Sequence, residues 1–340
     1  MSAISLARKL VIAASPHLRG PASTPVIMWN VVGSLVPIVT VASYFFGVSA
    51  LLVVAAATIG AVATEHLLGK GTSIGDGSAA ITGVLLGLTL PAGMPLWMAA
   101  LGGFVGIAFG KLIFGGLGYN VFNPALFGRA FLQASFPSAL TSWPAVGGSW
   151  WSLRGDNFAL PFMHPRTVDA VTAATPLGLL KFEGKPTSLL DLMLGNTGGS
   201  LGETAGLLIL ACGGYLALRG FLNWRLPLAV LGTVAVCMAV LHGIDATRYP
   251  SAPIALFSGG LMLGAVYMAT DPVTAPLTTV GRWIFGIGIG LLVVIIRVWG
   301  GLPEGVMYAI LLMNALTPFI NRATQPRVFG TRVAARGAPT

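Results

Sequence analysis

The sequence contains very little charge. Of its 340 residues, 55% are hydrophobic and only 9% are charged, whereas a soluble domain carries about 25% charged residues. A soluble protein of this size needs a charged surface around its core, so the composition argues against a soluble globular protein. Contact with lipid explains the missing polar surface most simply, and the 46 glycines suit transmembrane helices that pack closely.

Cysteine and clustered basic residues are also scarce. Cys212 and Cys237 lie within apolar runs, without a CxxC pair or metal-ligand spacing, and we interpret them as small buried hydrophobic residues. We therefore expect no metal site and no iron–sulfur ligation by this chain alone. The net charge of +9 comes from basic residues that stand singly at the ends of apolar runs, which argues against nucleic acid as a partner.

Long apolar runs fill most of the chain. A helix needs about 20 mostly apolar residues to cross a membrane. The candidate spans are 26–46, 48–67, 78–93, 96–114, 120–136, 203–219, 225–242, 252–270, 281–299 and 303–321. Gly and Pro interrupt several of them, for example around Leu90-Pro91 and around Thr270-Asp271-Pro272. Breaks at membrane depth require protein or a polar cavity to satisfy the freed backbone groups. The sequence thus predicts an all-α integral membrane protein with about ten transmembrane helices.

The distribution of Lys and Arg predicts the orientation, because cytoplasmic segments carry the excess of these residues. With the N-terminus inside, the inside segments hold Arg8, Lys9, Arg19, Lys70, Lys111, Arg219, Arg225, Arg282, Arg322, Arg327, Arg332 and Arg336. The short outside loops hold Arg248, with Arg297 at the outer end of its helix. We expect both termini in the cytoplasm and the long polar stretch 137–202 outside, where a loop of this length usually has a function.

The two halves of the chain look related. GSAAITGVLLGLTLP at 77–91 resembles GGLMLGAVYMATDP at 259–272, and each is followed by an apolar helix and a double glycine. Five helices in each half would make the second half enter the membrane the opposite way round, with functional sites at the interface. The predicted domains are an N-terminal arm (1–25), a first five-helix half (26–136), the outer loop (137–202), a second half (203–321) and a C-terminal tail (322–340).

Several longer motifs resemble one membrane-protein family. They are SPHLRGPASTPVIM, SIGDGSAAITGVLLGLTLP, GGLGYNVFNPALFGRAFLQASFP, DAVTAATPL, GNTGGSLGET, FSGGLMLGAVYMATDPVTAP and RVWGGLPEGVMYAILLMNALTPFINRATQPRVFG. Together they look like the family shared by the D subunits of Rnf complexes and the B subunit of the sodium-translocating NADH:quinone oxidoreductase. That B subunit normally has a longer N-terminal extension, so the resemblance favours the Rnf D subunits.

The resemblance implies a covalent flavin site in DAVTAATPL. In the family, the motif S/T-G/A-A-T accepts FMN through a phosphoester bond to its last threonine, which is Thr175 here. Asp169, Thr172, Ala174 and Pro176 complete the expected site. TAAT alone is a weak string that is typical of a small-residue loop or helix start, and only the whole-chain resemblance makes it an FMN site. A separate FMN transferase would form the bond, so no catalytic residue is expected in this chain.

The resemblance also implies a function, partners and a second flavin. The family holds riboflavin noncovalently and works with other Rnf subunits, especially the FMN-bearing G subunit and the A and E subunits in the membrane. The complete complex of the bacterial inner membrane couples ferredoxin and NAD redox to Na⁺ or H⁺ movement. A chain with covalent FMN would act there as an electron-transfer flavoprotein, without full activity in isolation.

Two roles stay open for several other residues. Asp169 either orients the motif during modification or caps a short helix. Ser200 forms a turn against a flavin or phosphate, or else Ser200 or Thr204 caps the next helix. Asp271 lines an ion or flavin pocket, since an intramembrane Asp is costly, or caps the turn at its proline. The Trp150-Trp151 pair anchors the loop at the headgroups or stacks on a flavin.

Two other functions compete with electron transfer. Ten helices in an inverted repeat would also suit a transporter or channel. The family resemblance likewise implies a fold similar to that of urea-type channels. A purely structural membrane scaffold is the third alternative. Neither has any need for a flavin on Thr175, so the modification state of this residue discriminates among the three.

Overall fold

A computed structural model of the chain describes residues 22–69, 74–161, 175–184, 187–203, 205–246 and 248–326. The first part forms α1 (Thr24–Phe46), α2 (Val48–Leu68), η1 (Ile74–Asp76), α3 (Ser78–Leu88), α4 (Leu96–Gly110), η2 (Leu112–Phe114), α5 (Pro124–Ser135) and α6 (Pro137–Thr141). The second forms α7 (Pro176–Gly178), η3 (Leu179–Glu183), α8 (Leu189–Leu194), η4 (Leu201–Glu203), α9 (Gly206–Leu218), α10 (Arg225–Ile244), α11 (Ala252–Phe257), α12 (Leu261–Leu263), η5 (Gly264–Met268), α13 (Thr279–Trp299) and α14 (Val306–Thr324).

The described residues form helices, turns and loops without a single strand, which confirms the predicted all-α class. Five helices are long and apolar enough to cross a membrane: α1, α2, α4 continued through η2, α10 and α13. The apolar helices α3 and α9 are shorter. The count of ten spans stays a prediction, because two of the predicted runs are broken. One helix ends at Leu88, and the run 252–270 is divided into α11, α12 and η5.

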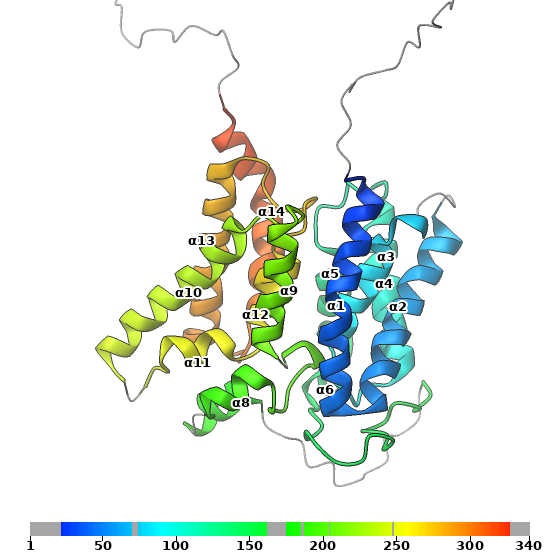
Figure 1. Ribbon diagram of the computed structural model, residues 1–340, viewed down its shortest axis with the longest axis horizontal. Coiled ribbons are helices and arrows are strands. Elements are labelled where there is room, and N and C mark those ends of the chain that lie inside the picture. Colours follow the sequence, from blue (N-terminus) through cyan, green and yellow to red (C-terminus); the bar gives the residue numbers. More distant parts are fainter. Residues whose placement is uncertain are drawn as a thin grey trace, which may run out of the picture.

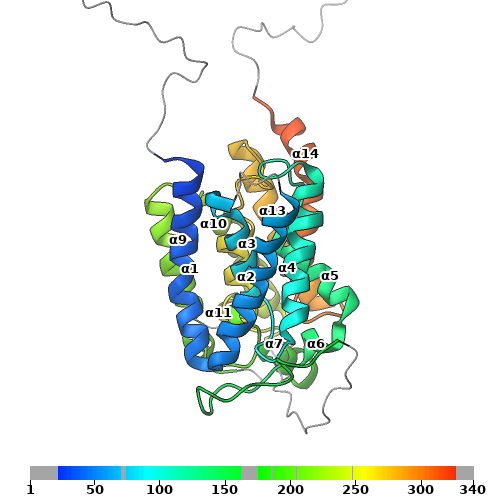
Figure 2. The ribbon, with the colours of Figure 1, turned by 90° about the vertical axis from the view of Figure 1, so that its right-hand side faces the viewer.

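The helices form two groups that meet along α1, α9 and the short helix α12–η5 (Figure 1). In the first group α2 packs against α3 and α4, and α4 packs against α5. In the second group α10 packs against α13, and α13 against α14. α1 begins and α14 ends at one end of the bundle, while α6 and α8 lie at the opposite end (Figures 1 and 2).

Glycines bring the helices of each group into close contact. A Cβ atom added at Gly60, Gly83 or Gly103 would overlap backbone atoms of the facing helix in the packing of α2 against α3 and α4. In the second group, Gly286 and Gly290 of α13 allow the same close approach to α10. Small residues serve this purpose in membranes, where association relies on van der Waals contact rather than on the hydrophobic effect.

The segment after α6 is held against the helix ends by Asn157. Its Nδ2 donates to the carbonyl oxygens of Ala92 (2.8 Å) and Met94 (3.0 Å), and its Oδ1 accepts from the hydroxyl of Ser49 (2.8 Å). Ala92 and Met94 belong to the irregular backbone that follows the break after α3. Asn157 is buried and satisfies these carbonyls, as a break near the bilayer requires.

A buried ion pair joins the helices of the first group at the end of the bundle opposite Asn157. The Nζ of Lys111 lies 2.5 Å from Oε1 of Glu65 and donates to the hydroxyl of Ser78 at 2.6 Å. The side chains of Lys111 and Glu65 are 2% and 1% exposed. Ser78 in turn donates to Asp76, at the start of α3. The pair therefore joins α2, α3 and the end of α4, and either charge alone would be strongly destabilising there.

We expect Lys111→Met to destabilise the protein by about 3–5 kcal/mol, because it leaves the Glu65 carboxylate buried without its partner. Thermal unfolding in detergent, followed by tryptophan fluorescence, measures the loss. The matched control is the double variant Lys111→Met/Glu65→Gln, which removes both charges and should recover most of the stability. A single variant as stable as the wild type would contradict this account.

Candidate functional site

Thr175 is the first described residue after the gap at 162–174, and it caps a helix. Its Oγ1 accepts a hydrogen bond from the backbone N–H of Gly178 (3.1 Å), and Pro176 takes the first helical position. A threonine at the N-cap followed by proline is a favoured helix start, because proline lacks an N–H that would need a partner there. The residue is half-buried. Its hydroxyl is therefore held in place but remains accessible.

Thr175 lines a cavity between the two groups of helices, here called the Thr175 cavity. Both groups contribute to its wall. The lining residues are Thr89, Leu126, Arg129, Gln133, Leu140, Thr141, Trp143, Thr175, Leu177, Ser200, Glu203, Gly260, Leu263, Met268, Leu302, Pro303, Glu304, Val306, Met307 and Tyr308. The wall is mostly apolar, with an indole and a few charged groups. Pockets for flat organic cofactors have this composition.

An ion pair across the junction lies in this cavity. Nη2 of Arg129 in α5 lies 3.5 Å from Oε2 of Glu304, which precedes α14. The other oxygen, Oε1 of Glu304, accepts from the backbone N–H of Gly260 at 2.7 Å, just before α12. Glu304 thus ties α5 of the first group to the start of the broken helix in the second. The pair is 10% and 24% exposed, so water screens it only in part.

Two further charged side chains lie near this pair, each with partners of its own. Arg297 donates to the carbonyl oxygens of Ala255 (2.7 Å) and Ser258 (2.9 Å). Oε1 of Glu203 accepts from the hydroxyl of Ser200 at 2.8 Å. Of the cations in this cluster, only Arg129 lines the Thr175 cavity. Its guanidinium is therefore the cationic group that a bound anionic or electron-rich molecule would meet.

A second cavity opens toward the other end of the bundle and is called the Asp271 cavity. Its polar wall contains Lys111, Asn120, Asn123, Thr270 and Asp271, and the remainder is mainly aliphatic and aromatic. Asp271 also accepts from the backbone N–H of Val273 (3.1 Å) and the hydroxyl of Thr274 (3.2 Å). The side chain therefore caps its turn and lines a cavity at the same time, and the two alternatives from the sequence do not exclude each other.

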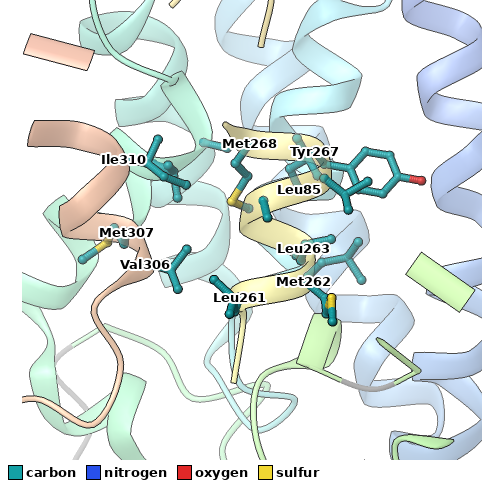
Figure 3. Close-up of a cluster of buried hydrophobic side chains, with 14 of the residues drawn as sticks. Leu85, Leu261, Met262, Leu263, Tyr267, Met268, Val306, Met307 and Ile310 are labelled. Carbon is teal, nitrogen blue, oxygen red and sulfur yellow. The ribbon is translucent and has the colours of Figure 1, made fainter. Parts of the chain in front are cut away.

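The short helix α12–η5 separates the two cavities. Leu263 and Met268 line the Thr175 cavity, whereas Tyr267 lines the Asp271 cavity. Figure 3 shows Met268 directed toward Ile310 of α14 and Tyr267 directed to the opposite side, toward α1. The Tyr267 hydroxyl donates to Ser34 in α1 at 3.1 Å. Side chains of the same short helix therefore line both cavities.

The other residues expected at the flavin site have different outcomes. Asp169, Thr172 and Ala174 lie outside the described residues, so their roles stay predictions. Pro176 is buried behind Thr175. Ser200 lines the Thr175 cavity and donates to Glu203, whereas α9 begins after Ala205 without a side-chain cap. Ser200 does not cap α9, because the N-cap position of that helix is Ala205, and Thr204, the other capping candidate, lies outside the described residues.

Trp150 and Trp151 pack edge to face with ring centres 4.6 Å apart and are both exposed. Neither lines the Thr175 cavity, whose indole comes from Trp143. The sequence reasoning missed Trp143, Arg129, Glu203 and Glu304. Arg129 carried a usable signal, since a charge inside the predicted span 120–136 is costly and marks function by default. Within the described ranges, no group of three or more His, Cys, Asp and Glu is placed to hold a metal ion.

Known proteins resemble this chain over nearly its full length. The D subunit of the proton-translocating ferredoxin:NAD(+) oxidoreductase complex of Clostridium ljungdahlii is 41% identical over 336 residues, which cover 94% of this chain and 96% of the relative. The D subunit of the Na(+)-translocating complex of Acetobacterium woodii is 44% identical, with 94% and 95% covered. The D subunit of the ion-translocating oxidoreductase complex of Stutzerimonas stutzeri is 40% identical, with 92% and 93% covered.

The match to a family is equally extensive. Residues 11–330 match the NQR2, RnfD, RnfE family, and this range includes Thr175, both cavities and every described helix. With relatives above 30% identity over most of both chains, the resemblance noted in the sequence is confirmed. The chain belongs to the NQR2, RnfD, RnfE family.

Proposed function

We propose that this chain is the D subunit of an Rnf-type complex that couples electron transfer between ferredoxin and NAD to Na⁺ or H⁺ translocation. Relatives that share 41% and 44% of their residues with it carry these activities in their names, one for protons and one for Na⁺. Because both ions occur among close relatives, similarity does not select the ion. The chain would act as an electron-transfer component rather than as a complete enzyme.

Covalent FMN on Thr175 is the central part of this proposal. The observation that carries it is the position of Thr175, whose half-buried hydroxyl lines a largely apolar cavity between the two helix groups. The residues fit the cofactor: Trp143, Leu126 and Leu263 offer flat apolar contact, and Arg129 offers a cation. Bound FMN would supply the electron chemistry, while the chain supplies position and electrostatics.

The Asp271 cavity suits the noncovalent riboflavin that the family resemblance implies. It combines amide and hydroxyl groups from Asn120, Asn123 and Thr270 with an apolar wall that includes Tyr267. A neutral flavin needs such a mixture, because its ring is apolar on its faces and polar at its edges. Flavins in the two cavities would lie on opposite sides of α12–η5, with residues of α3 and α5 also between them.

The proposed orientation has both termini in the cytoplasm and the Thr175 cavity at the outer face of the bacterial inner membrane. In support, α1 begins and α14 ends at one end of the bundle, and α6 and α8 lie at the other (Figure 1). The proposed partners are the FMN-bearing G subunit at the outer face, the A and E subunits in the membrane, and an FMN transferase during maturation. The lipid bilayer surrounds the remainder.

An inverted repeat is proposed from matching positions in the two halves. Gly77 and Gly259 both adopt positive φ, at 79° and 68°; Gly77 directly precedes the short helix α3, and Gly259 lies one residue further from α12. Lys111, at the end of α4, donates to Ser78 beside the first of these glycines. Arg297, near the end of α13, donates to the carbonyl of Ser258 beside the second. The interface of the repeats would then contain both cavities.

Covalent flavin makes the chain fluorescent after denaturation, so Thr175→Ala should abolish its in-gel fluorescence under ultraviolet light. The hydroxyl that forms the phosphoester is lost in this variant. Thr141→Ala is the matched control, since Thr141 lines the same cavity and should leave the fluorescence unchanged. Mass spectrometry of the peptide that contains Thr175 identifies the added group directly.

Fluorescence that survives in Thr175→Ala would contradict the attachment site. An unmodified Thr175 in the native complex would favour the transporter or channel with a urea-channel-like fold instead. If the flavin is present but Thr175→Ala leaves the complex fully active, the chain is a membrane scaffold.

We expect Arg129→Gln to lower the midpoint potential of the covalent flavin. Reduction adds negative charge to the isoalloxazine ring, and a nearby guanidinium stabilises that charge in a partly desolvated cavity. A loss of about 1.4 kcal/mol corresponds to about 30 mV for a two-electron couple. Redox titration of flavin absorbance in the purified complex measures the shift. Arg129→Lys keeps the charge and should retain most of the potential, and equal potentials in all three proteins would refute the role.

A further inference from the structure

A third cavity lies beside the Thr175 cavity and contains an unusual concentration of positive charge. It is bounded by α10, α11, α13, η3 and residues 248–250, at the end of the bundle where α10 inclines away from α13 (Figure 1). Lys181, Arg248 and Arg297 line it, together with apolar residues such as Met238, Val294 and Val298. We call it the basic cavity. Its described lining includes no Asp or Glu, although Glu304 and Glu203 of the neighbouring Thr175 cavity lie near Arg297.

The three cations contribute in different ways. Lys181 donates to the carbonyl oxygens of Arg297 (3.0 Å), Gly300 (2.5 Å) and Leu302 (2.9 Å), which uses all the hydrogens of its ammonium group. It therefore caps the C-terminal end of α13 and adds charge without a free donor. Burial lowers the pKa of Lys181. A nearby anion would relieve that effect.

Arg297 and Arg248 retain donors for a ligand. Nη1 and Nη2 of Arg297 bind backbone carbonyls, but its buried Nε has no hydrogen-bond partner among the described residues. A buried donor without an acceptor is costly, which makes an absent acceptor the simplest explanation. The Arg248 side chain is exposed, and its guanidinium carbon lies 5.5 Å from the ring centre of Tyr249. The two guanidinium groups line the same cavity from α13 and from the segment after α10.

The apolar part of the wall indicates what kind of anion fits. Part of it comes from α10 and α13, both long and apolar enough to cross a membrane. Apolar side chains on these helices, including Val236, Val240 and Ile295, are exposed around the same end. A small soluble anion would use the charges but not this surface. A phosphate group with acyl chains would use both.

We propose that the basic cavity binds an anionic phospholipid, with its phosphate held by the guanidinium groups of Arg248 and Arg297 and its acyl chains along α10 and α13. Basic pockets between transmembrane helices recognise lipid headgroups by this combination of charge and apolar surface. The proposal does not depend on the flavin, because Thr175 is not part of this cavity. It assigns to the second helix group a bound lipid beside the proposed redox site.

Photolabelling of the purified complex tests the site. The probe is phosphatidylglycerol with a photoreactive diazirine in an acyl chain, and labelled peptides are mapped by mass spectrometry. We expect labels on α10 and α13 peptides that border the cavity, with Arg248→Gln reducing them about tenfold, as expected for a lost charge-assisted hydrogen bond. Arg248 is exposed, so its replacement should not impair folding.

Controls separate this site from general lipid contact. Arg225 lies at the opposite end of α10 and has the same kind of contact, with its guanidinium carbon 5.0 Å from the ring centre of Trp224, and Arg225→Gln should leave the labelling unchanged. The matching phosphatidylcholine probe should label these peptides weakly, and millimolar inorganic phosphate should not displace phosphatidylglycerol. Equal labelling in Arg248→Gln, equal labelling by phosphatidylcholine, or displacement by phosphate would each overturn the proposal.

Discussion

The arrangement of the two helix groups depends on which partners hydrogen-bond the free backbone groups at the ends of α3 and η5, two helices that stop inside the bundle. At the end of η5, Asn123 provides the hydrogen-bond partners. Its Oδ1 accepts from the first N–H groups of α5, and its Nδ2 donates to the carbonyl of Met268 at the end of η5, 3.2 Å away. At the other break, Leu90 at the end of α3 accepts from the backbone N–H of Leu201. Each broken helix is therefore completed by the other half of the chain, as the absence of water in hydrocarbon requires.

Because the breaks are completed across the junction, polar groups gather there, and the cavities lie beside them. Asn123 lines the Asp271 cavity, and the Arg129–Glu304 pair lines the Thr175 cavity. Neither group of helices forms either cavity alone. A change that separated the groups would thus expose backbone and unpair charges at once, so the polar groups that line the cavities also stabilise the junction.

The sequence predicted the parts of this structure that depend on local composition. The apolar runs predicted the long helices, and Pro91 and Pro272 marked the irregular stretches that follow α3 and η5. No proline marked the break between α11 and α12. It did not predict which side chains meet, because Arg129 and Glu304 are 175 residues apart and no local pattern joins them. A lone arginine in an apolar run indicates a functional position, but it does not indicate which residue pairs with the arginine. Thr175 was identified from family resemblance, since TAAT has no distinctive physical pattern, and the cavity beside it became visible only in three dimensions.

The short helix α12–η5 links these observations to the proposed electron transfer. Its π-helical turn, Gly264–Met268, places Tyr267 and Met268 on opposite sides, and such turns are frequent at functional sites. Gly264 contacts Val306 and Ile310 so closely that a Cβ there would overlap the Val306 side chain, which fixes the helix against α14. The Tyr267 hydroxyl fixes the other side to α1. A wall held on both sides keeps the two cavities at a constant separation, and electron transfer between two bound flavins would depend on that separation most of all.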